Sequence, residues 1–266
     1  MNDRSHRPIG IFDSGIGGLT VYQAIRRDLP NESLIYLGDT ARVPYGTKSE
    51  ETVRRYTQEC LQFLLNKDIK LIVIACNTAS AYALERLNGE CPVPLLGVIL
   101  PGAKAAVAQT KAKKIGVIGT EGTIRSGAYL KAIRSLDRSV EVVSAACPLF
   151  VPLVEEGWIE GDIPRQVADR YLAPLKNSRV DAVILGCTHY PLLKSVIGGL
   201  LPGIHLIDSA DQTAQEAVHL LKENNLASPR KENSDQFFVT DSPSRFQRVG
   251  DIFLGHPLTD VTKIQL

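Results

Sequence analysis

The chain has 266 residues, of which 44% are hydrophobic and 22% charged, which is typical of a soluble globular protein with enough apolar material for one large or two modest domains. Its 30 basic and 29 acidic side chains leave a net charge of +1, which excludes recruitment of nucleic acid or an anionic membrane by a global electrostatic field. No apolar run approaches the roughly 18–20 residues of a membrane span, and the amino-terminal segment MNDRSHRPIG lacks an apolar signal core, so a cytoplasmic protein is expected.

Short β-rich runs alternate with helical patterns from the start of the chain. Strands are predicted at residues 8–12, 34–38 and 70–75, and helices at 17–29, 49–66 and 78–88. The runs LIVIA and AVILG are continuously apolar, which is typical of central strands in a parallel sheet covered by helices on both faces. In such α/β sheets, ligands bind beyond the carboxyl ends of the strands.

The pattern then begins a second time. KKIGVIGTEGTIRSGAYLKAI at 113–133 resembles RPIGIFDSGIGGLTVYQAI at 7–25, and DAVILGCTHYPLL at 181–193 resembles KLIVIACNTASA at 70–81, with nearly the same spacing in both pairs. This repetition indicates an internal duplication, with a seam near Pro101. We expect a first domain made of residues 1–98 and 210–266 and a second made of residues 99–209.

The carboxyl-terminal part continues beyond the second half. A helical pattern at 211–225 and a strand-like run at 235–240 are predicted to pack back onto the first domain. The segment 224–234 between them is rich in polar and turn-forming residues, which predicts a flexible, solvated loop.

Five cysteines, at positions 60, 76, 91, 147 and 187, include no CxxC pair, which argues against a disulfide framework and a zinc knuckle. A cysteine after an apolar run is usually a buried small hydrophobe, and Cys60, Cys91 and Cys147 are interpreted in this way. Cys76 and Cys187 differ because they follow strands in duplicated contexts. Amides at the start of a following helix would make their thiolates accessible at neutral pH.

Two further segments offer polar side chains near predicted strand ends. FDSGIGG places Asp13 and Ser14 after the first strand, where Asp13 is either functional or a simple helix cap. The glycines lack the spacing of a dinucleotide fingerprint and no GK[ST] occurs, so a nucleotide site is disfavoured. His189 follows Cys187 by two residues and is either a structural histidine or a group that exchanges protons with the thiol.

The loop GDTARVPYGTKS at 38–49 is rich in proline, glycine and small polar residues, so it is either a plain turn or a segment that offers Tyr45 and the Gly46 backbone to a ligand. PLFVPLVEEGWIEGD at 148–162 contains Glu155, which is either a cleft carboxylate or part of a solvated helix face. Lys48 and Arg125 are either counter-ions for an acidic ligand or surface charges.

Four motifs, IGIFDSGIGGLTV, YLGDTARVPYG, IACNTASA and GCTHYPLL, together resemble the cofactor-independent aspartate/glutamate racemase family, over residues 9 to about 210. The resemblance implies an α/β fold of two pseudo-symmetric, doubly wound parallel-sheet domains that face each other across a cleft. It also implies racemisation of L-glutamate to D-glutamate for peptidoglycan synthesis, no cofactor, no metal, and a homodimer. Each domain would present one cysteine to opposite faces of the substrate's α-carbon.

The resemblance also assigns roles to individual residues. Cys76 and Cys187 match the two catalytic thiols, the first acting on the D-enantiomer and the second on the L-enantiomer. Asp13 is similar to the acid that assists Cys76, His189 to the base that assists Cys187, and Glu155 to a further acidic participant. The residues similar to those that hold the amino acid are Asp13, Ser14, Tyr45, Gly46, Asn77, Thr78, Thr188 and His189.

Other functions compete with glutamate racemisation. Aspartate or hydantoin racemisation is a close alternative, since the length of the substrate side chain decides between them. A non-catalytic, two-lobed protein that binds an acidic amino acid is an alternative from a different class. A metal hydrolase is disfavoured because the remaining histidines lack HxxxH or HxH spacing beside an acidic partner; these are His6, His205, His219 and His256.

Overall fold

The computed structural model describes residues 4–230 and 234–266. Residues 1–3, part of the amino-terminal segment, and residues 231–233, part of the predicted flexible loop, lie outside this description. In the described residues the strands are β1 (Ile9–Asp13), β2 (Leu34–Gly38), β3 (Leu71–Ile74), β4 (Leu95–Gly97), β5 (Lys114–Gly119), β6 (Glu141–Ala146), β7 (Ala182–Gly186), β8 (His205–Asp208), β9 (Gln236–Val239) and β10 (Val261–Lys263).

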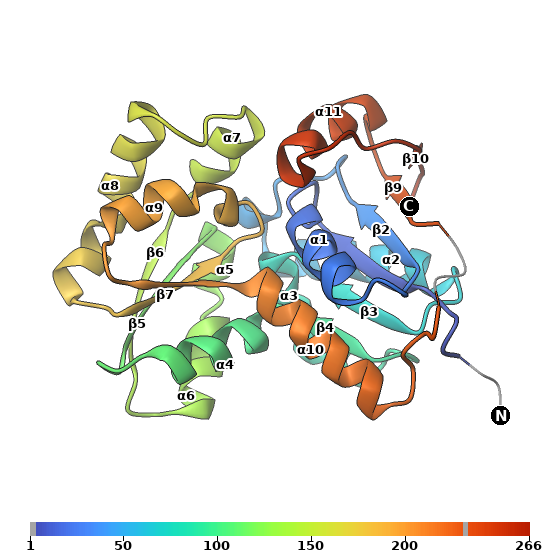
Figure 1. Cartoon of the computed structure of the whole chain (residues 1–266), viewed down its shortest axis with the longest axis horizontal. Coiled ribbons are helices and arrows are strands. Elements are labelled where there is room, and N and C mark those ends of the chain that lie inside the picture. The colour runs from blue at the N-terminus through green and yellow to red at the C-terminus, as the bar shows by residue number, and fades with distance from the viewer. Residues whose placement is uncertain (1–3, 231–233) are drawn as a thin grey trace.

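Helices connect these strands and lie on both faces of two sheets, which are side by side in the molecule (Figure 1). This confirms the predicted α/β fold with two doubly wound sheets. The helices are α1 (Leu19–Asp28), α2 (Glu50–Leu65), α3 (Asn77–Leu87), α4 (Ile99–Gln109), α5 (Glu121–Arg125), α6 (Ala128–Leu136), α7 (Phe150–Glu155), α8 (Asp162–Ser178), α9 (Lys194–Leu200), α10 (Ser209–Glu223) and α11 (Pro243–Leu254).

The two sheets repeat one topology. Within the described residues the larger sheet has the order β10-β9-β2-β1-β3-β4 and the smaller β6-β5-β7-β8, and every strand pair is parallel. Thus β1 and β5 occupy equivalent central positions, with β3 and β7 beside them. Both strands that lead to the paired cysteines therefore have equivalent places, as the internal duplication predicted.

The carboxyl-terminal segment returns to the larger sheet, as predicted. The strand β9 pairs with β2, and β10 pairs with β9. The helix α10 packs against α1 of the first half and α4 of the second, and it runs from the junction of the two halves along the half with the larger sheet (Figure 1). The strands of each sheet fall inside the segments expected for each domain, and the boundaries at 98 and 209 stay a prediction.

Apolar strand residues divide between the two faces of each sheet, which explains their continuously hydrophobic sequences. In β1, Ile9 and Ile11 belong to one core and Phe12 to another. The core that contains Ile9 also includes Val183 and Leu185 of β7, so it continues from one sheet to the other. This shared core fixes the position and orientation of the two halves relative to each other. Cys60 and Cys147 are buried, as expected for small hydrophobes, whereas Cys91 is half-buried.

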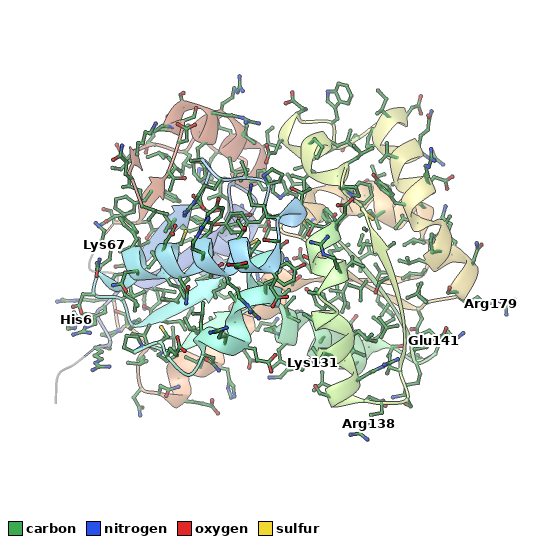
Figure 2. All side chains as sticks on the ribbon, turned by 180° about the vertical axis from the view of Figure 1, so that it is seen from behind. His6, Lys67, Lys131, Arg138, Glu141 and Arg179 are labelled. Carbon is green, nitrogen blue, oxygen red and sulfur yellow. The ribbon has the colours of Figure 1, made fainter. Side chains whose placement is uncertain are left out.

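Charged side chains such as Lys131, Arg138, Glu141 and Arg179 are exposed at the periphery (Figure 2). Among the described residues, no helix has the length and apolar character needed to cross a bilayer.

A buried ion pair fastens the chain at the amino end of the larger sheet. Lys70 Nζ lies 2.6 Å from Glu32 Oε2, and both side chains are almost completely buried. The same ammonium donates to the carbonyls of Ser5 and Leu226, and Ser228 N–H donates to Glu32 Oε1 at 2.8 Å. The beginning of the predicted solvated loop is thus attached to buried charges through the Leu226 carbonyl and the Ser228 amide, although Ala227 between them is exposed.

We expect Lys70→Met to lower the free energy of unfolding by about 3–5 kcal/mol, because removing one partner leaves the buried Glu32 carboxylate without its counter-ion. Urea unfolding followed by circular dichroism measures this loss. Lys131→Met is the control, since Lys131 pairs with Glu85 at the surface and its loss should leave the unfolding midpoint unchanged. Equal midpoints for Lys70→Met and the native chain would contradict the expectation.

Candidate active site

A pocket opens where the carboxyl ends of strands from both sheets face each other. It encloses about 490 Å³ when the space open to solvent at its mouth is included. Its walls come from the segments after β1, β2, β3, β5 and β7, together with α7. The lining residues are Ser14, Gly15, Val43, Pro44, Tyr45, Gly46, Cys76, Asn77, Thr78, Thr120, Val151, Glu155, Cys187, Thr188 and His189.

The two cysteines in duplicated contexts line this one pocket from opposite sheets. Cys76 follows β3 and is the N-cap of α3, and its Sγ accepts a hydrogen bond from Ala79 N–H at 3.5 Å. Cys187 follows β7, and its Sγ lies 3.8 Å from His189 Nδ1. The helix-start amide predicted for both thiols is therefore present for Cys76. The residues after Cys187 form a short 3-10 turn (Tyr190–Leu193) instead, and an imidazole takes the place of the amide.

Burial and negative charge keep Cys76 protonated. Burial raises the pKa of its thiol to about 12, and the neighbouring Asp13 carboxylate adds to the increase, while hydrogen bonds from Ser14 and Ala79 oppose it. Deprotonation of this thiol therefore requires a change in its surroundings, such as the arrival of a ligand.

Asp13 lies behind the pocket wall and is 1% exposed. Its Oδ2 accepts a hydrogen bond from Gly15 N–H at 2.9 Å, whereas Oδ1 has no hydrogen-bond partner among the described residues. Burial raises the pKa of Asp13, and the charge of His189 and the amides of Gly15 and Gly18 only partly offset this. The carboxyl group is thus adjacent to Cys76 without being part of the pocket lining, so direct contact with a ligand is not supported by this geometry.

His189 connects Cys187 to a carboxylate. His189 Nδ1 faces the thiol, and Nε2 lies 3.2 Å from Glu155 Oε1. Burial lowers the pKa of His189, but the hydrogen bonds to Cys187 and Glu155 and their charges outweigh it and raise the pKa to about 10. The imidazole is consequently a cation at neutral pH, held between two acceptors.

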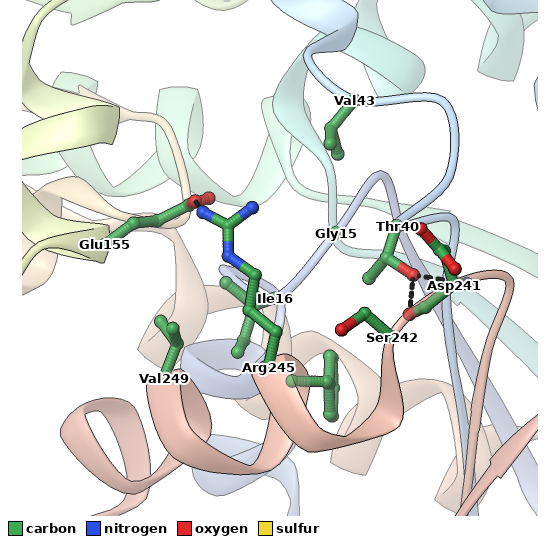
Figure 3. A pocket seen from close by; sticks show the side chains of 10 residues that line it. Gly15, Ile16, Thr40, Val43, Glu155, Asp241, Ser242, Arg245 and Val249 are labelled. Carbon is green, nitrogen blue, oxygen red and sulfur yellow. Dashed lines mark hydrogen bonds and ion pairs between the residues drawn. The ribbon is translucent and has the colours of Figure 1, made fainter.

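Glu155 has a second partner on the other side of the pocket. Its Oε2 lies 3.0 Å from Arg245 Nη2, and Figure 3 shows the guanidinium of Arg245 directed toward it from α11. Burial raises the pKa of Glu155, but His189 and Arg245 outweigh this and hold the pKa below its ordinary value. Glu155 is therefore a carboxylate, as expected for a cleft group.

The remaining predicted residues supply neutral donors to the pocket. Asn77 Oδ1 accepts a hydrogen bond from Tyr129 Oη at 2.7 Å, which leaves its amide group as the donor that Asn77 can offer a ligand. The Thr78 hydroxyl lies 2.9 Å from that of Thr120. Tyr45 lines the pocket, but its phenol donates to the buried Asp39 at 2.5 Å and is thus already engaged.

Neither predicted cation reaches the pocket. Arg125 donates to the carbonyl of Lys48 at 3.2 Å, and both residues lie outside the lining. Of the two alternatives left open for Lys48 and Arg125, the structure supports surface charges. The described lining residues include no lysine or arginine, so an anionic ligand would be held by hydroxyls, amides, the amino end of α3 and the His189 imidazolium. Within residues 4–230 and 234–266, no three metal-ligating side chains are grouped as a metal site.

Sequence reasoning did not single out Gly15, Val43 and Pro44, which lie within recognised motifs, or Thr120, Val151 and Arg245, which lie outside them. Thr120 lies after β5 as Ser14 lies after β1, so the internal duplication contained the signal for it. Val151 is one of several apolar residues in α7, and no sequence pattern distinguishes it from the others. Arg245 belongs to a segment outside all four recognised motifs.

Each of the two parallel sheets presents one thiol to a common pocket. The protein is therefore of the two-domain α/β class in which both halves form a single site. The family model for Asp/Glu/hydantoin racemases matches residues 9–217. The chain therefore belongs to the Asp/Glu/hydantoin racemase family, which confirms the resemblance of the four motifs.

Individual relatives agree over nearly the whole length. A glutamate racemase from Geobacter metallireducens is 53% identical over 262 residues, covering 98% of this chain and 97% of that protein. The crystal structure of a glutamate racemase from Bacillus anthracis has a TM-score of 0.95 at 41% identity, with 98% of each chain covered. That of glutamate racemase from Francisella tularensis in complex with D-glutamate has a TM-score of 0.93 at 40% identity, again with 98% of each covered.

We expect Asp13→Asn to stabilise the protein increasingly as pH rises above 3.8, the ordinary value for aspartate. Because burial raises the pKa of Asp13, the folded protein binds a proton in this pH range that the unfolded chain has released, so its stability falls with rising pH. Asparagine cannot ionise and lacks this loss.

Urea unfolding of both proteins across the pH range measures the difference, with the exposed Glu160→Gln as the control for removal of a carboxylate. A difference between Asp13→Asn and the native chain that stays constant or shrinks with rising pH would contradict the assignment.

Proposed function

We propose that the protein interconverts L- and D-glutamate by a two-base mechanism without an organic cofactor. The observation that carries the proposal is the pair of thiols, one from each sheet, in a single pocket. Each thiol has its own titratable neighbour, Asp13 for Cys76 and His189 for Cys187. A non-catalytic binding function, the alternative considered above, would not require two thiols that each adjoin a titratable group.

The reaction needs a base and an acid on opposite faces of the α-carbon. One thiolate removes the α-proton, the carbanion shares its charge with the α-carboxylate, and the opposite thiol returns a proton to the other face. The product has inverted configuration, and the two thiols have exchanged protonation states. A single fixed base would have to move across the substrate to do both.

The two thiols have different neighbours. Burial keeps Cys76 neutral, whereas the His189 imidazole lies 3.8 Å from the sulfur of Cys187. In the family pattern Cys187 acts on the L-enantiomer, for which its sulfur is the base. Reaction of D-glutamate requires the opposite arrangement, with Asp13 available to take a proton from the Cys76 side.

The developing negative charge is stabilised by fixed donors rather than by a cofactor's electron sink. Asn77, Thr78 and Thr188 line the pocket, and the helix α3 begins at Asn77, so its free N–H groups point toward the same region. Because these donors are already in place, little free energy is needed to reorient them when charge develops. This arrangement supports proton abstraction from a weakly acidic carbon.

Glutamate is favoured over aspartate by the relatives. The Francisella tularensis enzyme was solved with D-glutamate, and the Escherichia coli glutamate racemase with L-glutamate. An aspartate racemase homologue from Pyrococcus horikoshii is only 18% identical and supports the fold alone. Supply of D-glutamate for peptidoglycan synthesis, a cytoplasmic location and assembly as a homodimer rest on the family resemblance and stay predictions.

We expect the purified protein, without added cofactor, to exchange the α-proton of L-glutamate in D2O and to abolish its optical activity, while L-aspartate stays unchanged. Proton NMR and polarimetry follow both events in one sample. If the protein instead exchanged and racemised L-aspartate but not L-glutamate, the substrate would be aspartate and the glutamate assignment would be wrong. No exchange with either amino acid would favour the binding protein, which calorimetry with glutamate would then test.

We expect Cys76→Ser and Cys187→Ser each to lower racemisation by roughly 10²–10⁴-fold, the usual contribution of a positioned acid or base. Circular dichroism should show unchanged folding, since serine is similar in size. Cys91→Ser is the matched control, because Cys91 lies outside the pocket and should keep full activity. Full racemisation by either pocket variant would exclude the two-thiol mechanism.

A further inference from the structure

The helix α11 belongs to the larger sheet's half of the molecule but contacts catalytic groups of the other half. It packs against α1, where Gly250 lies close to Leu19, and Phe246 contacts Tyr36 of β2 with ring centroids 5.7 Å apart. Figure 1 shows α11 on the side that faces α7. Its position is thus determined by the first half.

Two residues of this helix reach the His189 assembly. Arg245 Nη2 pairs with Glu155 Oε2 at 3.0 Å, and the ring of Phe253 packs edge-on against the His189 imidazole, with centroids 5.4 Å apart and an interplanar angle of 87°. The first half therefore contacts both the imidazole and its carboxylate partner.

The two oxygens of the Glu155 carboxylate have different partners. Oε1 accepts from His189 Nε2, and Oε2 accepts from Arg245, so each oxygen has a different cation. A carboxylate held at one oxygen presents the other in a defined direction. With Nε2 held in this way, Nδ1 of the same rigid ring faces Cys187.

A hollow beside the active-site pocket explains why this contact is needed. It is lined by Gly15, Val43, Glu155, Arg245 and Val249, among others, and encloses about 460 Å³, counting its open side (Figure 3). Glu155 borders both the hollow and the pocket. Without Arg245, little on this side would hold the end of the Glu155 side chain.

We infer that Arg245 is a positioning residue for the reaction: by pairing with Glu155 from the opposite half of the molecule, it holds the carboxylate that orients His189 toward Cys187. The role rests on the proposed racemase function of the pocket. It makes the geometry around Cys187 depend on the approach of the two halves, because the arginine comes from one and the histidine from the other. An ion pair with an exposed arginine adds little to the free energy of unfolding, so the fold does not depend on the Arg245–Glu155 pair.

A double-mutant cycle measures whether Arg245 acts through Glu155. We expect Arg245→Ala to lower kcat for glutamate roughly tenfold in the native background and to have no further effect in Glu155→Gln, where its partner charge is absent. Arg245→Lys should recover part of the loss. Arg248→Ala is the matched control, since Arg248 lies exposed on the same helix and should retain native kcat. An equal loss in both backgrounds, or none in the native one, would overturn the inference.

A spectroscopic readout separates this inference from the racemase proposal. The imidazole N–H signals of His189, identified by their loss in His189→Asn, should be protected from solvent exchange in the native protein. We expect them to broaden or vanish in Arg245→Ala and to persist in Arg248→Ala. Unchanged signals in Arg245→Ala would refute the positioning role even if the protein racemises glutamate. Failure of the native protein to racemise would refute the proposed function while this measurement still tests the contact.

Discussion

The site depends on one geometric constraint: the carboxyl edges of two parallel sheets meet at the same pocket. A parallel strand delivers the chain to one edge only, so residues that follow β1, β2, β3, β5 and β7 collect there from distant parts of the sequence. The repeated strand order gives Cys76 and Cys187 equivalent places on the two sheets. The core shared between the sheets then fixes the distance across which the thiols face each other.

The two thiols are equally buried and have equivalent positions, but their neighbouring side chains differ. Cys76 is surrounded by a buried carboxylate and weak donors, and burial raises the pKa of its thiol. Cys187 lies beside an imidazole whose charge is supported by Glu155. The pseudo-symmetry of the fold thus ends at the side chains that adjoin the two thiols.

Much of the site was predictable because its residues follow apolar strands within motifs. The duplication pointed to Cys76 and Cys187 together, and the structure brings both to one pocket along with Ser14, Gly46 and His189. Local patterns left side-chain direction open: the Tyr45 hydroxyl points to Asp39, and Arg125 binds the Lys48 carbonyl. A loop sequence states which groups are available, but packing against neighbouring elements decides where each of them points.

By itself, the sequence determined the α/β class, the repeated halves, the strand ends that carry the thiols and, through its motifs, the family. These features are encoded in local hydrophobic runs and in the residues that directly follow them. Only the tertiary structure decided that Asp13 lies behind the pocket wall, that Thr120 lies opposite Gly46, and that Arg245 pairs with Glu155. Such contacts join segments far apart in the chain, and their geometry comes from how the sheets and helices pack, which no local pattern records.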